Sequence, residues 1–303
     1  MIPSVHPKLS IVFLNYNRLE ETRTTVQQLM NINRDRTDIE VIAVDNGSTD
    51  GTPAFLQQHS DWMRVLILDC NTGIGGLNKG FHIATGDYIM VLDDDSHPRD
   101  TATIDNLIKC LDCRPDVGVV ACRIEHPDGT PFRTWHLPEV DAPGPSAAFV
   151  GCGFAIRRDL FQQIGWFPDH FFLYQNEVET AIRVIQCGFG IHYDPSCRVV
   201  HRESEVGRTS WRQVYFPTRN TIWIIRRYFK MPEALLMLAS RILFGFVRAV
   251  QTGQMRCYCL AVKEGLNEKI HQDLLPRDLS RRLRIFKRHN NVFYHLMGKF
   301  QFN

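Results

Sequence analysis

The sequence predicts an α/β fold for roughly the first two thirds of the 303-residue chain. Short apolar runs of strand length alternate with polar stretches that favour helices, as in a parallel sheet covered by helices. Polar residues also gather directly after successive apolar runs, and ligands bind at the carboxyl edge of such a sheet. These observations predict a nucleotide-binding domain at residues 1–210, followed by a helical, basic extension at residues 211–303.

The predicted elements of the domain follow one another in a regular order. The first strand leads into the turn Asn15-Tyr16-Asn17-Arg18, after which a helix is expected at residues 19–31. The second strand leads into a polar turn that begins at Asp45 and contains two glycines. The fourth strand leads into three aspartates and is stopped by Pro98. The four predicted strands are residues 9–14, 39–44, 65–68 and 88–92.

Three consecutive aspartates, Asp93, Asp94 and Asp95, are the most informative feature of the chain. Like charges this close repel one another, so a cation or hydrogen-bond donors must compensate them. A divalent metal is the usual compensator, and Mg²⁺ or Mn²⁺ suits oxygen ligands. Successive residues at a strand end point to opposite faces, so Asp94 ranks below its neighbours as a ligand. The alternative is a solvated acidic turn.

Two familiar phosphate-binding loops are missing from the sequence. The dinucleotide fingerprint needs three spaced glycines in the first strand-to-helix turn, which contains none. The nearest glycine cluster, residues 73–80, has Asn78 where the last glycine should fall. A Walker-type loop is absent too. Without such a loop, a metal ion held by Asp93 and Asp95 would have to neutralise the charge of a bound pyrophosphate.

A second acidic cluster contains Glu177 and Glu179, at the start of a helix expected at residues 178–187. Both glutamates could serve only the helix, because acids favour its first turn and Glu179 can pair with Arg183. Residues two apart on a helix are rotated by about 200°, so the two cannot both face one cleft. One glutamate is expected to be structural and the other chemical.

Taken in order, these motifs resemble family 2 glycosyltransferases of the GT-A fold over roughly residues 8–205. The resemblance implies an inverting transferase that uses a UDP- or dTDP-linked sugar, a divalent metal and a glycan or lipid-linked acceptor. It assigns metal binding to Asp93 and Asp95, completed by His201 after another strand. It maps the catalytic base onto Glu177, with Glu179 in reserve, although Asn176 replaces the family's preceding acid. The donor-binding residues it implies are Asn15, Tyr16, Asn17, Asp45, Asn71, Gly73, Asn78, Asp94 and Gly151.

The resemblance is closest to bacterial enzymes of surface polysaccharide synthesis, including rhamnosyltransferase-like members. Two competing classes stay open. A nucleotidyltransferase shares a related fold, but it usually carries a glycine-rich basic loop after its first strand, and none is seen. A protein that binds a nucleotide sugar without catalysis is the second competitor, because Asn176 departs from the family pattern.

Charge is distributed unevenly along the chain. Residues 1–200 hold 16 Lys+Arg against 26 Asp+Glu (net −10), whereas residues 201–303 hold 19 against 7 (net +12). Basic and bulky apolar residues interleave at 223–230 and 281–288, which is typical of segments that lie on anionic lipid. No nucleic-acid-binding motif accompanies them. An anionic membrane surface is therefore a predicted partner, and a basic face that only aids solubility is the alternative.

Cysteine usage and the apolar segments bear on location. Nine cysteines at irregular spacing, after a start without a secretory pattern, predict a reducing, cytoplasmic compartment. The pairs Cys110/Cys113 and Cys257/Cys259 lack partners at zinc-site spacing, so ordinary thiols are expected. Residues 234–250 are apolar but interrupted by arginines, so no transmembrane helix is predicted and membrane binding would be peripheral.

Overall fold

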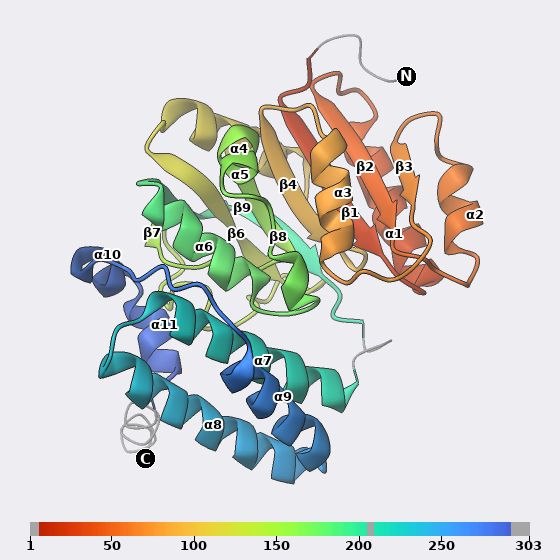
Figure 1. The fold of residues 1–303 in the computed structure, drawn as a ribbon. Helices are drawn as coiled ribbons and strands as arrows, with labels where there is room; N and C mark the ends of the chain where they lie inside the picture. Colours follow the sequence, from red (N-terminus) through yellow and green to blue (C-terminus); the bar gives the residue numbers. More distant parts are fainter. Residues whose placement is uncertain (1–5, 205–208, 292–303) are drawn as a thin grey trace. The chain divides into compact units, whose positions relative to one another are not determined.

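The computed structural model describes residues 6–204 and 209–291, and the chain divides into two compact units (Figure 1). The first unit comprises Met1–Phe172 and Asn176–Val206, and the second comprises Leu173–Gln175 and Gly207–Asn303.

The first unit is built on a mixed sheet with the order β3-β2-β1-β4-β8-β6-β9-β5, in which β7 also pairs with β9. The strands β3, β2, β1 and β4 are parallel, whereas β8 runs antiparallel between β4 and β6. All four predicted strands are confirmed to within one residue at each end. The strands are β1 Leu9–Asn15, β2 Ile39–Asp45, β3 Arg64–Ile67, β4 Tyr88–Asp93, β5 Ser96–Pro98, β6 Val117–Glu125, β7 Gly144–Ser146, β8 Gly153–Arg157 and β9 Gly190–His201.

Helices cover the faces of this sheet (Figure 1). Helix α3 packs closely on β1 and β2 because a Cβ at Gly80 would lie 2.6 Å from Val12 and 2.9 Å from Val44. Helix α4 begins at Asp100, whose carboxylate accepts the Thr103 N–H at 2.9 Å and caps the first turn. The helices are α1 Leu19–Asn33, α2 Thr52–Gln57, α3 Gly75–Ile83, α4 Thr101–Cys113, α5 Arg158–Gln163, the 3₁₀ turn η1 Asp169–Phe171 and α6 Asn176–Gln186.

Strands β1, β2 and β4 form the core of the first unit. Every residue of β2 is buried, and so are the first five residues of β1 and of β4. Such continuous burial is expected of parallel strands covered on both faces, and it explains their apolar runs. Polar residues therefore appear only where the strands end, so the fold brings those of β1, β2 and β4 to one edge.

Glu40 is an exception, because it is a buried acid near the amino end of β2. Its Oε1 accepts the Ser10 hydroxyl at 2.6 Å, the Gly86 N–H at 3.1 Å, and the N–H and hydroxyl of Thr85. Burial raises the pKa of Glu40, but these hydrogen bonds outweigh it and hold the pKa below its usual range. The ionised carboxylate thus ties the turn before β4 to β1 and β2.

We expect Glu40→Ala to lower the free energy of unfolding by about 2–4 kcal/mol near pH 7, because several buried donors lose their acceptor. Since folding lowers the pKa, the stabilisation is present above the unfolded pKa of about 4.5 and fades as the pH falls below it. Urea unfolding between pH 3 and 8 measures both effects. Glu20→Ala, at an exposed glutamate of α1, is the matched control, and equal losses in the two variants would contradict this role.

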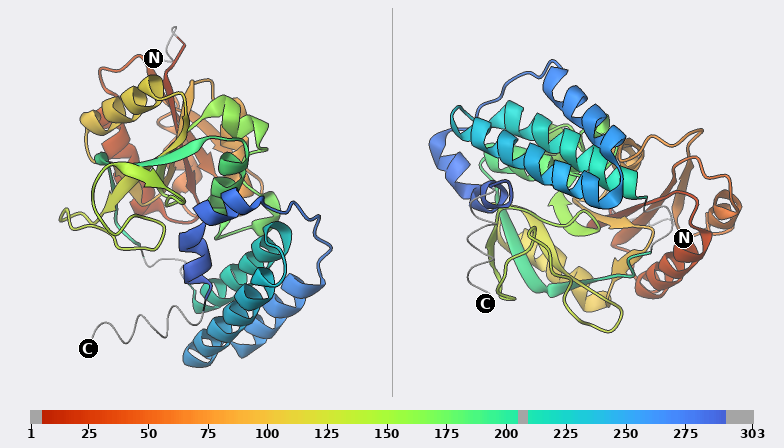
Figure 2. Two further views of the ribbon diagram at one scale, coloured as in Figure 1. Left: turned by 90° about the vertical axis from the view of Figure 1, so that its left-hand side faces the viewer. Right: turned by 90° about the horizontal axis from the view of Figure 1, so that it is seen from below.

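The second unit is helical. Helices α7 Ser210–Tyr228, α8 Glu233–Thr252 and α9 Met255–Asn267 lie side by side (Figure 2), and α10 Arg277–Arg282 and α11 Arg284–His289 follow. The hydroxyl of Tyr258 on α9 donates to Ile242 O of α8 at 2.8 Å. A Cβ at Gly265 would lie 3.0 Å from Ile222, so the glycine brings α9 close to α7. Asn220 also donates to the carbonyls of Leu173 and Tyr174, both at 2.9 Å.

The basic-aromatic segments of this unit belong to its interior. Tyr228 is fully buried, and Trp223 and Phe229 are less than 10% exposed. The ring of Phe286 stacks on that of Phe229, with centroids 5.6 Å apart. These four aromatic side chains are therefore packed inside the unit and are not available to lipid, while the predicted membrane partner stays a prediction. Within the described ranges, no helix combines the length and apolarity that crossing a bilayer requires.

Candidate functional site

The turns after β1 and β2 are joined to each other. Asn17 has a left-handed backbone, with φ 52°, and its N–H donates to the Ser48 hydroxyl at 2.9 Å. Its side-chain oxygen accepts the Thr49 N–H at 2.7 Å. Tyr16, beside it, is half-buried. The two turns thus form one continuous surface at the carboxyl edge of the sheet, where the sequence predicted a nucleoside pocket.

Asn15 is fully buried at the end of β1 and holds neighbouring elements together. Its side-chain N–H donates to Val44 O at 3.3 Å, and its side-chain oxygen accepts the Thr22 hydroxyl at 2.8 Å. These two bonds fix the end of β1 against β2 and α1. The structure therefore gives Asn15 a supporting role, and its predicted contact with the nucleoside stays a prediction.

Asp45 is a buried carboxylate at the end of β2. Its Oδ2 accepts the Ser48 N–H at 2.9 Å. Its Oδ1 is also buried, and among the described residues it has no hydrogen-bond partner. Buried polar atoms are rarely left without partners, so this oxygen is suited to accept a hydrogen bond from a ligand.

Asn46 organises the loop after β3, although no sequence motif distinguished it from the rest of its turn. Its amide donates to Asn71 Oδ1 and to Gly73 O, both at 3.0 Å, and its oxygen accepts the Thr72 N–H at 3.1 Å. Gly73 has φ +62°, and a Cβ there would lie 2.1 Å from Phe172 O. The predicted donor residues Asn71 and Gly73 thus belong to one rigid loop.

Asn78 of α3 fastens that helix to the segment that leads towards α6. Its amide donates to Phe167 O at 2.9 Å and to the Asp169 carboxylate, and its oxygen accepts the Phe167 N–H at 3.1 Å. Both the amide nitrogen and the amide oxygen of Asn78 therefore already have hydrogen-bond partners within the protein. Its predicted place near the diphosphate and sugar stays a prediction.

The three aspartates have different surroundings. Asp93, the last residue of β4, is exposed, whereas Asp94 and Asp95 are 5% and 1% exposed. Arg18 donates to Asp94 Oδ1 at 2.7 Å and to Asp95 Oδ2 at 3.5 Å. Burial raises the pKa of Asp94 to about 7, and Arg18 opposes this shift. Arg18, which the sequence placed only in a turn, thus partly neutralises the cluster.

His201 reaches the aspartates through strand pairing. In the antiparallel pair of β5 and β9, Ser96 lies opposite His201, which places His201 Nε2 3.2 Å from Asp95 Oδ1. Burial disfavours the charged imidazole, but Cys152 and the Asp95 carboxylate outweigh burial and raise the pKa of His201 above its usual value. Asp95 Oδ2 also accepts the Ser204 N–H at 3.0 Å.

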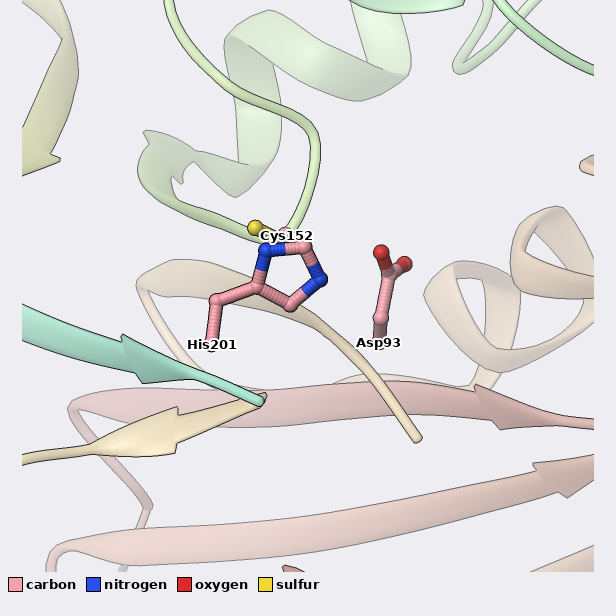
Figure 3. A group of neighbouring side chains, drawn as sticks. All are labelled: Asp93, Cys152 and His201. Atoms are coloured by element: carbon pink, nitrogen blue, oxygen red, sulfur yellow. The ribbon is translucent and has the colours of Figure 1, made fainter. Parts of the chain in front are cut away.

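Asp93, Cys152 and His201 each offer one ligand atom, and these atoms all lie within 4.8 Å of one another (Figure 3). Figure 3 shows the His201 ring between the Cys152 sulfur and the Asp93 carboxylate. Cys152 lies near Asp93 because Leu92 of β4 pairs with Gly153 of β8. Carboxylate and imidazole ligands fit a divalent cation, whereas burial raises the pKa of the Cys152 thiol and disfavours the thiolate that would bind a metal. Cys152 was not among the metal ligands predicted from the sequence.

A second group of potential ligands lies elsewhere, where Cys110, His192 and Asp194 come within 4.8 Å of one another. No metal-ligating partners of Cys110 were predicted from the sequence. Only the fold brings His192 and Asp194 of β9 beside it. Arg114 contacts His192 Nδ1 at 2.8 Å, so a guanidinium cation already lies against the imidazole. This positive charge disfavours a metal ion there.

The two candidate glutamates of α6 are clearly different. Glu179 is 2% exposed, and its carboxylate accepts from Arg183 Nε at 2.6 Å, as the structural alternative predicted. The side chain of Glu177 is 14% exposed, and its Oε1 lies 3.3 Å from His136 Nε2. A Cβ at Gly151 would lie 4.0 Å from Glu177 Oε2, so Gly151 adjoins this carboxylate, and its predicted role in binding the donor stays a prediction. Asn176 Nδ2, when oriented to donate, lies 3.1 Å from the same oxygen.

A sheet that gathers carboxylates, amides and an imidazole at its carboxyl edge is typical of α/β proteins that bind ligands at this edge, and here it includes a candidate cation site. Residues 10–182 match the model of the family described as Glycosyl transferase family 2. The chain belongs to this family.

Several bacterial proteins are similar to the chain over much of its length. The probable glycosyltransferase YdaM of Bacillus subtilis is 24% identical over 258 residues, which cover 78% of this chain and 60% of YdaM. The O-antigen biosynthesis protein RfbC of Myxococcus xanthus is 27% identical over 226 residues, covering 65% of this chain and 17% of RfbC. The N-acetylglucosaminyl-diphospho-decaprenol L-rhamnosyltransferase of Mycobacterium tuberculosis is 25% identical over 207 residues, covering 55% and 67% respectively. The chain thus spans less than two thirds of the length of the first two relatives.

Two solved structures share the fold. The mannosyltransferase PcManGT of Pyrobaculum calidifontis, in complex with GDP-Man and Mn²⁺, aligns with a TM-score of 0.60 at 21% identity, covering 86% of this chain and 75% of that one. GalNAc-T7 with UDP, GalNAc and Mn²⁺ aligns with a TM-score of 0.59 at 16% identity, covering 77% and 50%. The predicted GT-A fold is confirmed.

Proposed function

We propose that this protein is an inverting, metal-dependent glycosyltransferase that moves a sugar from a nucleoside-diphosphate donor to a hydroxyl group. The observation that carries the proposal is a half-buried carboxylate, Glu177, in the same unit as the Asp93–Cys152–His201 group, in a chain of family 2. The Glu177 carboxylate is suited to take a proton. The second group is suited to hold a cation that neutralises negative charge on a leaving diphosphate.

The chemistry assigns a distinct task to each group. Glu177 accepts the proton of the acceptor hydroxyl, whose oxygen attacks the anomeric carbon as the bond from that carbon to the diphosphate breaks. Attack from the side opposite the leaving group inverts the configuration. Asp93, Asp95 and His201 would hold a divalent ion, Mg²⁺ or Mn²⁺, which supplies charge neutralisation for the diphosphate. The rigid loop of Asn71 and Gly73 borders the donor.

The buried Oδ1 of Asp45 is suited to accept an N–H of the donor's base. Uracil, thymine and guanine each carry a ring N–H that can donate to an ionised carboxylate, whereas cytosine and adenine lack one. Among these bases, the family resemblance favours uracil and thymine. A UDP- or dTDP-linked sugar therefore fits the end of β2. The test is release of nucleoside diphosphate from a panel of UDP-, dTDP-, GDP- and CDP-sugars with Mn²⁺ or Mg²⁺ and a mixed acceptor pool. Release from a GDP- or CDP-sugar alone would refute the assignment of uracil or thymine.

The relatives support a role in bacterial surface polysaccharide synthesis, with a glycan or lipid-linked acceptor. They include an O-antigen biosynthesis protein and a rhamnosyltransferase named for a decaprenol-linked substrate. A lipid-linked acceptor lies in a membrane, so a peripheral position on the cytoplasmic face of that membrane is part of the proposal.

Helix α8 provides a surface that is suited to peripheral membrane binding. Its outer face carries large apolar side chains that are 40–60% exposed: Leu235, Leu236, Leu243, Phe246, Val247 and Val250. Their spacing places them within about 120° of the helix circumference, an arc that contains no charged residue. Basic residues dominate the rest of residues 201–303, with 19 Lys+Arg against 7 Asp+Glu. An apolar face within a basic region suits an anionic lipid surface better than a second copy of the same positive unit.

We expect the triple variant Leu243→Ser, Phe246→Ser, Val250→Ser to bind vesicles of mixed phosphatidylglycerol and phosphatidylcholine at least about tenfold more weakly, because buried apolar area is lost. Flotation measures this. The matched control is Ile67→Ser with Val140→Ser, two exposed apolar residues of the first unit. Unchanged flotation of the triple variant would refute the α8 surface. A dimer that dissociates in that variant, without vesicle binding by the native chain, would indicate a second copy instead.

A further inference from the structure

His136 lies against the carboxylate of Glu177, although nothing in the sequence pattern linked the two residues. Its Nε2 is 3.3 Å from Glu177 Oε1, and the two side chains are 15% and 14% exposed. His136 comes from the long connection between β6 and β7, whereas Glu177 begins α6. His136 is the ionisable side chain within ion-pair distance of Glu177 in the described part of the chain.

The ring of His136 is held from two other sides. Its Nδ1 lies 2.9 Å from the Thr134 hydroxyl, and the ring stacks on Trp135 with centroids 3.9 Å apart and planes at 30°. When the Thr134 hydroxyl donates to Nδ1, the neutral ring carries its proton on Nε2. That tautomer places an N–H on the ring nitrogen that lies 3.3 Å from Glu177 Oε1. The Nε2 atom is buried and makes no hydrogen bond among the described residues, so the neighbouring carboxylate is its natural acceptor.

We propose that His136 is a positioning residue that orients the Glu177 carboxylate for proton removal from the acceptor. This inference rests on the proposed function, in which Glu177 is the base. A donor at Oε1 stabilises the carboxylate and fixes its rotation. Oε2, beside Gly151, keeps a lone pair for the incoming proton even when the Asn176 amide donates to it. The arrangement leaves proton transfer to one defined oxygen.

The test compares kcat and KM of the native chain, His136→Phe and His136→Gln. Phenylalanine keeps a flat ring against Trp135 but has no donor, whereas glutamine returns an N–H near the position of Nε2. We expect His136→Phe to lower kcat about tenfold to a hundredfold, with little change in KM for the donor sugar. His136→Gln should recover most of this loss in kcat.

Glu177→Gln distinguishes the two proposals, because it tests the base without involving His136. If Glu177→Gln keeps turnover, the base assignment fails and the inference about His136 falls with it. If Glu177→Gln is inactive but His136→Phe keeps the native kcat, only the positioning role is overturned. Loss in His136→Phe as complete as in Glu177→Gln, without recovery in His136→Gln, would also overturn it.

Folding is checked by thermal unfolding and by calorimetric titration of UDP and dTDP. If His136→Phe does not fold, Thr134→Val serves instead, because it removes the hydroxyl that sets the tautomer while leaving the imidazole. The value of kcat should then fall by a smaller factor than in His136→Phe, and an unchanged kcat would overturn the inference.

Discussion

Glu177→Gln should lower kcat by about a thousandfold, because a positioned general base contributes roughly 10²–10⁴ to a rate. Glutamine has nearly the same shape as glutamate but cannot accept the hydroxyl proton. Binding of the nucleoside diphosphate should stay within about twofold of native, since the base does not hold the donor. Single-turnover release of nucleoside diphosphate, with the acceptor present, measures the loss in the chemical step.

Two glutamate controls sharpen this prediction. Glu139→Gln changes an exposed glutamate of the connection that also contains His136, and it should keep the native rate. Glu179→Gln breaks the buried pair with Arg183, so it should lower the melting temperature while the folded fraction stays active. If Glu179→Gln loses turnover and Glu177→Gln retains it, the roles of the two glutamates are reversed.

Asp95→Asn should weaken Mn²⁺ binding and lower turnover by about a hundredfold or more, because the leaving diphosphate loses charge compensation. The isosteric change limits structural damage at this 1% exposed residue, whose Oδ2 accepts the Ser204 N–H. Electron paramagnetic resonance of Mn²⁺, titrated with protein and nucleoside diphosphate, reports binding independently of turnover. Asp35→Asn, at an exposed aspartate after α1, is the control.

Chelation extends the same prediction to the native chain. EDTA should abolish release of nucleoside diphosphate, and excess Mn²⁺ should restore it. Asp93→Asn should weaken Mn²⁺ binding with little effect on stability, because Asp93 is exposed at the end of β4. Full turnover in EDTA, with unchanged kinetics for Asp95→Asn, would exclude the metal-dependent route.

Local pattern was enough to locate the strands and their polar ends, because buried parallel strands need continuous apolar runs. The same reasoning was not sufficient for residues 223–230, where periodicity reveals an apolar face but not the helix that covers it. Gly265 brings α9 against Ile222, and the bulky side chains of α7 are thereby buried. The exposed apolar face of α8, by contrast, depends on which helices pack against one another, and no sequence pattern marked it.

The sequence by itself determined the α/β class, the family resemblance, and the presence of Asp93, Asp95 and Glu177 at the ends of elements, because each depends on neighbours along the chain. Tertiary structure alone decided which distant residues meet. His201 reaches Asp95 through the register of β9 on β5, and Cys152 reaches Asp93 through the register of β8 on β4. His136 reaches Glu177 from an irregular connection. Pairing register and loop path depend on packing across the whole unit, and no local pattern encodes them.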